Sequence, residues 1–385
     1  MSLASSDAIA DCVRSASEPF RIVGAGTWLH AGRPVRASEM LNTSALSGIV
    51  EYVPGDLTMT VLGGTSLAAL DEATAREGQW MGIDPAGSPL GTIGATVATA
   101  SFGPLAHGNG RMRDIVLGME VVTGNGDIIR SGGKVVKNVA GFDIARLQVG
   151  AWGTLGVLTE ISLRLRARPE VDETVCIALD ARKPLAAHLL DLREIPLAAL
   201  AVELICPALA QLLNLGDTQR LLVRLGGNET RVRSQRAALA SLGDLGTVPN
   251  AIWESIQSVD TSDHAIARVS HLPSQLAHSW THVYNEVFSV MHAPGLMRAT
   301  VSRGSIRVVI PVSPGFSVHE NAAALTKIAP TLAPPGGHVV WEQLPDVVWH
   351  GVPSAVGDDL SSGLQRAFDA ARRCNPGILG PAVAK

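Results

Sequence analysis

The stretch Asp84-Pro85-Ala86-Gly87-Ser88-Pro89-Leu90-Gly91-Thr92-Ile93-Gly94-Ala95-Thr96-Val97-Ala98-Thr99 decides the fold of this chain. Two later stretches, 138–143 and 150–157, share its composition, because glycine, threonine and other small residues separate short apolar runs in all three. Glycine allows a positive φ and lets main-chain N–H groups approach a ligand without a Cβ in the way. Successive N–H groups in such turns form nests for phosphate oxygens. Glycine content alone is equally consistent with a turn-rich core that binds no ligand. The order of the segments must therefore distinguish a phosphate-binding site from such a core.

Length and composition indicate a globular protein of two domains. The chain has 385 residues, of which 46% are hydrophobic and 17% charged, and its net charge is −4. Chains beyond about 250–300 residues usually divide into domains. The basic residues are scattered, which predicts no nucleic-acid partner. No apolar run reaches about 18 residues, which predicts no transmembrane segment, and the four cysteines form no C-x-x-C pair that would hold a metal or cluster.

The first glycine turn follows an expected strand at 20–23 and reads Gly24-Ala25-Gly26-Thr27-Trp28. A dinucleotide-binding Rossmann turn requires G-x-G-x-x-G opening a helix. Leu29 stands where the third glycine would be, and Pro34 comes too soon for a crossover helix. We therefore reject a Rossmann unit, although this turn could still hold a pyrophosphate through its main-chain N–H groups.

Periodicity predicts the remaining elements. Asn125-Gly126 between apolar runs predicts a tight hairpin. Beyond residue 168 the expected strands 173–179, 200–205, 221–225, 265–269 and 306–310 alternate with the expected helices 185–193, 229–242 and 319–328. This alternation lacks phosphate-loop glycines, and it favours a separate α+β domain with an antiparallel sheet. A last helix is expected over 358–373, with acids at its start and arginines at its end.

A series of motifs follows the first glycine turn in a characteristic order. They begin at Gly24, Tyr52, Gly64, Asp84, Arg113, Gly132 and Gly153. They read G-A-G-T-W, Y-x-P-x-D-L, G-T-S-L-x-x-L, D-P-x-x-x-x-x-G-T-I-G, R-D-I-V-L-G, G-G-K-V-V-K-N-V-A-G-F-D and G-T-L-G-V-L-T-E. In this order they resemble the FAD-binding domain of the vanillyl-alcohol oxidase/p-cresol methylhydroxylase (PCMH) superfamily. More narrowly, the chain is similar to the smaller FAD-binding subunit of bacterial glycolate oxidase (glycolate dehydrogenase).

The resemblance implies an α+β fold in which a two-subdomain PCMH-type FAD-binding domain precedes an α+β cap domain with an antiparallel sheet. The FAD-binding domain would cover 1–168, with subdomains of about 1–80 and 81–168. The cap or substrate domain would cover 169–335, and a C-terminal segment, 336–385, would return toward the FAD-binding domain. Weaker elements of the same subunit are R-x-S-x-x-P from Arg268 and N-P-G from Asn375.

Residue by residue, the resemblance places the cofactor on three segments. The pyrophosphate turn maps to Gly24, Ala25, Gly26, Thr27 and Trp28. The second segment maps to Asp84, Pro85, Gly91, Thr92, Ile93, Gly94, Thr96 and Thr99. The adenine-side turn maps to Gly150, Gly153, Thr154, Gly156 and Val157.

The chain departs from the family pattern at three places. Covalent members carry a histidine where Thr27 stands, so we expect noncovalent FAD. The family has two glycines after Thr-Ile, whereas this chain has Gly94-Ala95, which is tolerable if φ of Ala95 is negative. The family segment F-D-P-x-G is present only as Phe368-Asp369-Ala370, which leaves the approach of that helix to the flavin open.

The chemistry implied by the resemblance is hydride removal from a carbon that bears a hydroxyl group, with the flavin as acceptor. A 2-hydroxy acid needs a cation for its carboxylate and a base for its hydroxyl. Arg268 and Glu342 are the catalytic candidates, with a structural ion pair and a sheet-edge position as their alternatives. His107, His271 and His338 are further candidates, each also explained as an ordinary loop or strand-end residue. Lys134 and Lys137 are expected on a solvated face, and no metal site is predicted because no H-x-x-x-H pair occurs.

Two functions remain open at this point. In the first, the chain is an FAD-binding subunit that carries electrons between a larger FAD-containing catalytic subunit and an iron–sulfur subunit of a glycolate (2-hydroxy acid) oxidase. In the second, it is a self-sufficient flavin dehydrogenase or oxidase of a small hydroxy acid or alcohol. The sparse catalytic set favours the first. The N-terminus lacks a basic secretory n-region, so we expect a cytoplasmic protein that reaches the inner membrane face only through partners.

Overall fold

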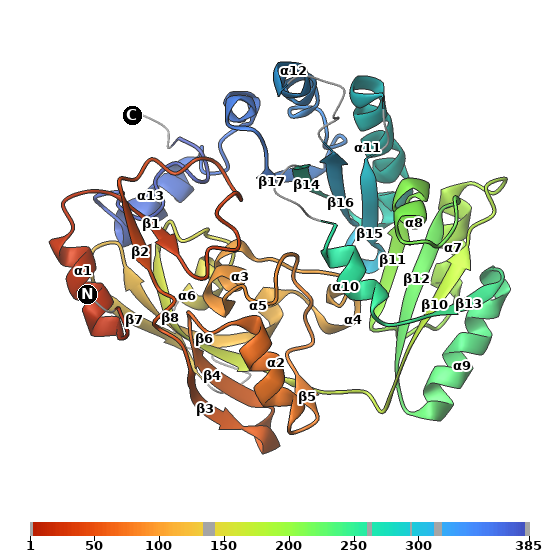
Figure 1. Ribbon diagram of the computed structural model, residues 1–385, viewed down its shortest axis with the longest axis horizontal. Helices are drawn as coiled ribbons and strands as arrows, with labels where there is room; N and C mark the ends of the chain where they lie inside the picture. The colour runs from red at the N-terminus through yellow and green to blue at the C-terminus, as the bar shows by residue number, and fades with distance from the viewer. Residues whose placement is uncertain (1–2, 134–142, 260–263, 293–294, 312–317, 382–385) are drawn as a thin grey trace. The chain divides into compact units, whose positions relative to one another are not determined.

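The computed structural model describes residues 3–133, 143–259, 264–292, 295–311 and 318–381. These form two compact units, which Figure 1 shows in ribbon form. The first unit consists of Met1–Phe102, Gly110–Arg168 and Pro353–Lys385. The second consists of Gly103–Asn109 and Pro169–Val352. Each unit combines helices with antiparallel sheet, so the predicted α+β class is confirmed.

The first unit is built on a five-stranded antiparallel sheet of order β3-β4-β8-β6-β7. Its strands are β3 (Ile49–Val53), β4 (Thr58–Leu62), β6 (Val116–Thr123), β7 (Ile128–Gly132) and β8 (Gly156–Arg164). The predicted hairpin is confirmed, because β6 and β7 pair across Asn125-Gly126 and Gly126 has φ 85°. Two smaller pairs complete the strands: parallel β1 (Phe20–Val23) and β2 (Glu39–Asn42), and antiparallel β5 (Gln79–Trp80) and β9 (Arg166–Ala167).

Helices cover both faces of this sheet. Its helices are α1 (Ser6–Ser15), α2 (Leu67–Ala75), α3 (Ile93–Thr99), α5 (Met112–Ile115), α6 (Ile144–Gln148) and α13 (Asp359–Phe368), with one 3₁₀ turn, η1 (Pro54–Asp56). On one face, apolar residues of β4, β6 and β8 pack with α2, α3 and α5. On the other face, Ile9 and Val13 of α1 pack with Val122 and Val157. Strand residues point alternately to the two faces, so the apolar run of β6 contributes to both cores.

The second unit is one eight-stranded antiparallel sheet of order β13-β10-β12-β11-β15-β16-β14-β17. Its strands are β10 (Val171–Ala178), β11 (Ala201–Ile205), β12 (Arg220–Gly227), β13 (Leu245–Val248), β14 (His264–Ser270), β15 (Leu296–Thr300), β16 (Ser305–Pro311) and β17 (His338–Gln343). Its helices are α4 (Ala106–Asn109), α7 (Leu185–Glu194), α8 (Pro207–Leu212), α9 (Glu229–Leu239), α10 (Ile252–Gln257), α11 (Leu276–Met291) and α12 (Val318–Ile328). Its 3₁₀ turns are η2 (Ala240–Leu242), η3 (Pro273–Gln275), η4 (Val301–Arg303) and η5 (Asp346–Gly351).

Three boundaries differ from those expected. The split near residue 80 does not divide the sheet, because β4 pairs with β8 from Thr58↔Arg164 to Leu62↔Glu160. The boundary at 336 moves to 353, because β17 pairs with β14 in the second unit. Residues 103–109 also belong to the second unit, where the N–H of Gly108 donates to the carbonyl of Leu200. Each difference arises from pairing between segments far apart in the chain, which local periodicity does not encode.

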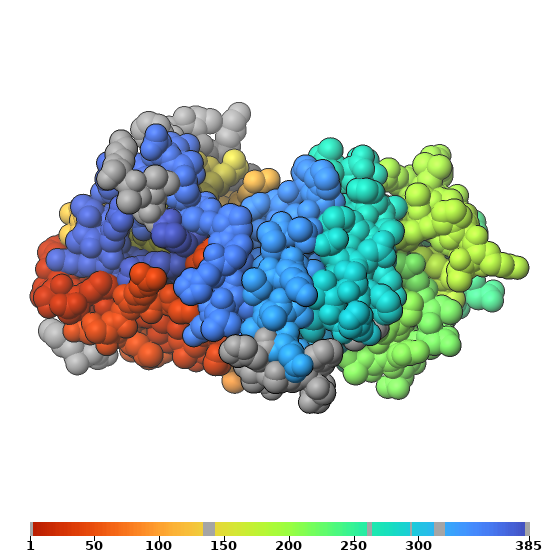
Figure 2. Space-filling view, turned by 90° about the horizontal axis from the view of Figure 1, so that it is seen from above, coloured from red at the N-terminus to blue at the C-terminus, as the bar shows by residue number. Residues whose placement is uncertain are grey.

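The last helix is shorter than expected, since α13 ends at Phe368 and not near 373. Asp369 is fully buried and its carboxylate accepts the main-chain N–H groups of Arg373 and Cys374. An aspartate that takes over backbone donors in this way competes with the helix. The chain then turns back along β1 in the first unit, where Figure 2 shows dark-blue C-terminal residues against red N-terminal ones.

Candidate functional site

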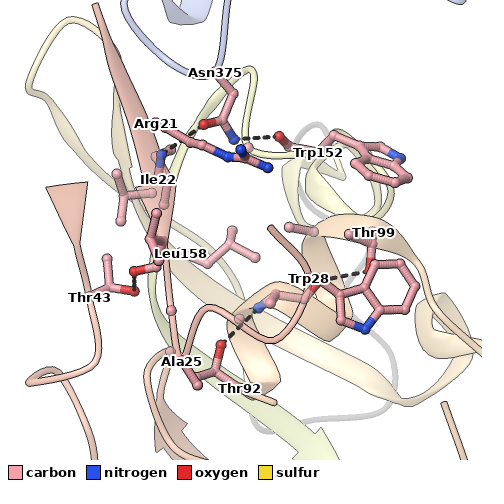
Figure 3. A pocket seen from close by; sticks show the side chains of 18 of the residues that line it. Arg21, Ile22, Ala25, Trp28, Thr43, Thr92, Thr99, Trp152, Leu158 and Asn375 are labelled. Atoms are coloured by element: carbon pink, nitrogen blue, oxygen red, sulfur yellow. Dashed lines mark hydrogen bonds between the residues drawn. The ribbon is translucent and has the colours of Figure 1, made fainter. Parts of the chain in front are cut away.

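A pocket opens within the first unit, where β1, the turn after it, α3, the start of β8 and the C-terminal segment meet (Figure 3). The pocket is open to solvent at its mouth, and most of the residues that line it are glycine, threonine or apolar residues.

Three separated turns bring predicted cofactor residues to this pocket. From the first turn, Gly24, Ala25, Gly26, Thr27 and Trp28 line it. From the second segment, Thr92, Gly94 and Thr99 line it. From the third, Gly153, Gly156 and Val157 line it.

Close backbone contacts explain the glycines at the pocket wall. A Cβ on Gly24 would lie 2.4 Å from Oγ1 of Thr92, the hydroxyl that caps α3 by accepting the N–H of Ala95. A Cβ on Gly94 would lie 2.7 Å from the carbonyl oxygen of Gly63. Ala95 lies in α3, where helical φ is negative, so its methyl group is accommodated as the sequence required.

The other predicted cofactor residues lie behind the wall. Ile93 and Thr96 are buried in the core, and the hydroxyl of Thr154 donates to the carbonyl of Ala151. The N–H of Gly91 closes a local turn by donating to the carbonyl of Ser88, whereas the N–H of Gly150 donates to the carbonyl of Val97 in α3. The segment that holds Asp84 and Pro85 supports the pocket indirectly.

Gly87, in the same segment as Asp84 and Pro85, packs directly against the indole of Trp28. A Cβ on Gly87 would lie 2.4 Å from Nε1 of Trp28. The ring of Trp28 lies 6.5 Å from that of Trp152, centroid to centroid. The two indoles form an apolar wall of the pocket (Figure 3).

Several lining residues were not predicted from the sequence. Among them are Arg21, Leu29, Thr43, Gly63, Trp152, Asn375 and Ile378. The N-P-G tripeptide and the Gly63-Gly64 pair were the available signals for two of them. Arg21 is the single ionisable side chain among the described residues that line the pocket, and its Nη2 donates to the carbonyl of Leu29. Burial lowers the pKa of Arg21, yet a guanidinium stays protonated at neutral pH.

The catalytic candidates Arg268 and Glu342 lie together in the second unit, in a buried charge ladder across its sheet. Arg298, Arg307 and Arg268 are direct cross-strand neighbours on β15, β16 and β14. Glu342 on β17 pairs with Arg307 and lies 3.6 Å from Nε of Arg268.

Glu203 on β11 pairs with Arg298 at the other end of this ladder. Burial alone would raise the pKa of Glu342, but Arg307 and Arg268 outweigh it and leave that pKa below its ordinary value. Complete burial raises the pKa of Glu203 despite the opposing charge of Arg298. The two glutamates of the ladder therefore differ, because the pKa of Glu342 is lowered and that of Glu203 is raised.

The histidine candidates His107, His271 and His338 all lie in the second unit. His107 lies on α4, where burial and then the charge of Arg303 lower its pKa to about 4. Nε2 of His271 contacts the carbonyl oxygen of Pro335, and His338 is exposed at the start of β17. Lys134 and Lys137 lie outside the described residues. Among the described residues no cluster of three or more His, Cys, Asp or Glu could hold a metal ion.

The N-terminal part of the chain matches a known family. Residues 2–132 match the FAD binding domain family. This match confirms the FAD cofactor that was predicted from the sequence.

Curated relatives of the FAD-binding domain include glycolate oxidase subunits. The chain is 34% identical over 240 residues to glycolate oxidase subunit GlcE of Escherichia coli (strain K12), which is 62% of this chain and 63% of the relative. It is 39% identical over 153 residues to glycolate oxidase subunit GlcD of Bacillus subtilis (strain 168), which is 40% of this chain and 33% of the relative. The matches therefore span less than two thirds of these relatives.

Solved structures share the fold at low sequence identity. A 4-ethylphenol oxidase from Gulosibacter chungangensis aligns with TM-score 0.72 and 14% identity over 98% of this chain and 88% of that one. An alkyldihydroxyacetonephosphate synthase aligns with TM-score 0.68 and 16% identity over 97% of this chain and 76% of that one. In the part of the chain that the structure describes, no helix has the length and apolar character needed to cross a membrane.

Proposed function

We propose that this chain is the FAD-binding subunit of a complex that oxidises glycolate or a related small 2-hydroxy acid. The observation that carries the proposal is the glycine-lined pocket within the FAD-binding domain. The similarity to GlcE over 240 residues supports the choice of substrate class. Electrons would pass from a larger FAD-containing catalytic subunit through the noncovalent FAD of this chain to an iron–sulfur subunit. The chain would be cytoplasmic and would reach the inner membrane face only through these partners.

The chemistry of the pocket lining supports FAD as its ligand. The main-chain N–H groups of the Gly24–Trp28 turn are the candidates for the diphosphate, because no Cβ at Gly24 or Gly26 shields them. Thr27 offers no nucleophile of the histidine type that would bond to the flavin. Trp28 and Trp152 supply apolar surface that would exclude water. Bound FAD would supply the two-electron acceptor, and the protein would supply its position and surroundings.

The alternative is a self-sufficient dehydrogenase that uses Arg268 for the substrate carboxylate and Glu342 as the base. A useful general base has a pKa near the working pH. The pKa of Glu342 is instead held low by Arg307 and Arg268, whose charges it already balances. This observation favours the electron-carrying role over substrate oxidation within this chain.

Anaerobic mixing with glycolate or D-lactate tests the two roles. We expect the visible absorption of the FAD-loaded isolated chain to remain, because Arg307 and Arg268 hold the pKa of the candidate base Glu342 below its ordinary value. Bleaching is expected once the catalytic and iron–sulfur partners are added. Rapid bleaching of the isolated chain would overturn the electron-carrying role, and co-purification with an iron–sulfur protein would support it.

Acid precipitation tests the noncovalent attachment. We expect all of the yellow colour in the supernatant, because Thr27 stands where covalent relatives carry histidine. Absorption of the supernatant at visible wavelengths, compared with that of the redissolved pellet, measures the released fraction. Flavin retained by the denatured chain would contradict this expectation.

A further inference from the structure

The C-terminal segment extends the small β1 sheet at the pocket. Phe20 and Cys374 form a parallel bridge. The N–H of Phe20 donates to the carbonyl of Arg373 at 2.9 Å, and the N–H of Asn375 donates to the carbonyl of Phe20 at 3.0 Å. Residues from the end of the chain thus lie beside the strand that leads into the first glycine turn.

At the next position a side chain replaces the backbone as partner of β1. Oδ1 of Asn375 accepts the N–H of Ile22 at 2.7 Å, and its Nδ2 donates to the carbonyl of Trp152 at 2.8 Å (Figure 3). Asn375 is 6% exposed and has φ 45°. Asparagine tolerates this left-handed conformation better than most residues.

The two bonds join segments that line the pocket from different sides. Ile22 lies two residues before Gly24, and Trp152 immediately precedes Gly153. A Cβ on Gly153 would lie 2.6 Å from Nδ2 of Asn375, so the glycine is required for this approach. Within the described part of the chain, these contacts fix the distance between the first and third cofactor turns.

We propose that Asn375 is a positioning residue for FAD, whose side-chain amide holds the first and third turns at the spacing that the cofactor requires. The inference rests on the proposal that this pocket is the FAD site. If the turns separate, only a fraction of the molecules is competent to bind, and the apparent Kd rises by the inverse of that fraction. FAD affinity would then depend on a residue near the end of the chain, far in sequence from both turns.

Two substitutions separate the amide from the backbone. Asn375→Gly keeps the left-handed φ and removes both bonds. Asn375→Asp keeps the acceptor for Ile22 but cannot donate to the carbonyl of Trp152 when ionised. For two bonds we expect a roughly 10- to 30-fold weaker Kd in the glycine variant. The aspartate variant should lie between it and the wild type, and the visible circular dichroism of the bound flavin should change in both.

Asn125→Ala is the matched control. Its side chain also tethers the C-terminal segment, through the carbonyl of Ala367 and the N–H of Ala370, but away from the pocket. We expect it to lower the melting temperature without changing the Kd for FAD, measured by fluorescence titration of the full-length apoprotein well below melting. If the glycine variant does not fold, the Kd of the isosteric aspartate variant tests whether the Asn375 amide contributes to FAD binding.

Wild-type affinity in folded Asn375 variants would overturn the proposal. Equal weakening by Asn125→Ala would also overturn it, because general tethering of the segment would then explain the loss. A wild-type chain that binds no FAD would instead refute the proposed function, so the two failures are distinguishable.

Discussion

Replacing Gly94 by alanine is expected to weaken FAD binding by about one to two powers of ten. Gly94 lies in the first turn of α3, and its N–H donates to the Gly63 carbonyl at 2.8 Å. An added Cβ would lie 2.7 Å from that carbonyl oxygen. Gly63 is itself packed closely against β8, because a Cβ on Gly63 would lie 2.1 Å from the carbonyl oxygen of Leu158. The strain, about 1–3 kcal/mol for an overpacked site, would therefore displace α3 at the pocket wall.

Gly55→Ala is the control for the Gly94 substitution. Gly55 lies in the same unit, in η1, and a Cβ there would meet nothing within 4 Å. Calorimetric titration of each apoprotein with FAD measures the Kd. An unchanged Kd in folded Gly94→Ala protein would show that the contact of Gly63 with Gly94 does not shape the cofactor site.

Replacing Glu342 by glutamine is expected to lower the free energy of unfolding by about 3–5 kcal/mol, as for other buried pairs that lose one partner. Glu342 is 4% exposed, and its single negative charge lies against both Arg307 and Arg268. The amide keeps the shape but not the charge. Two adjacent buried guanidinium groups on β16 and β14 would then repel each other without a counter-ion on β17.

The pH dependence of this effect has a defined sign. The pKa of Glu342 is lower in the folded protein than its ordinary 4.5, so its ionisation stabilises the fold above that value. The contribution is lost as the pH falls through the folded-state pKa. Urea unfolding should therefore show a full difference between wild type and variant at pH 7 and a smaller one in acid.

Glu72→Gln is the control for the Glu342 substitution. Glu72 forms an exposed pair with Arg76 on α2, and solvent screens such pairs. We expect little change in stability at either pH. A Glu342 variant as stable as the wild type at pH 7 would show that the ladder does not depend on that charge.

Local chemistry was readable from the sequence wherever a short segment determines its own conformation. Asn125-Gly126 specified the β6–β7 hairpin because a tight turn needs residues that adopt positive φ. The motifs at Gly24, Thr92 and Gly153 marked turns that line the pocket, because glycines occur where the backbone approaches another group closely. The expected strands and helices of the second unit appear with small shifts in their ends.

Only the tertiary structure decided which of these segments meet. Pairing of β4 with β8 and of β17 with β14 set the domain boundaries, since hydrogen bonds between distant strands leave no local pattern. Asn375 reached the pocket wall because the C-terminal segment lies along β1. Arg268 and Glu342 proved to be members of a charge ladder, because strand register set their neighbours. The sequence by itself determined the glycine turns and most of the expected strands and helices, whereas long-range pairing determined the pocket, because only folding brings distant residues into hydrogen-bonding distance.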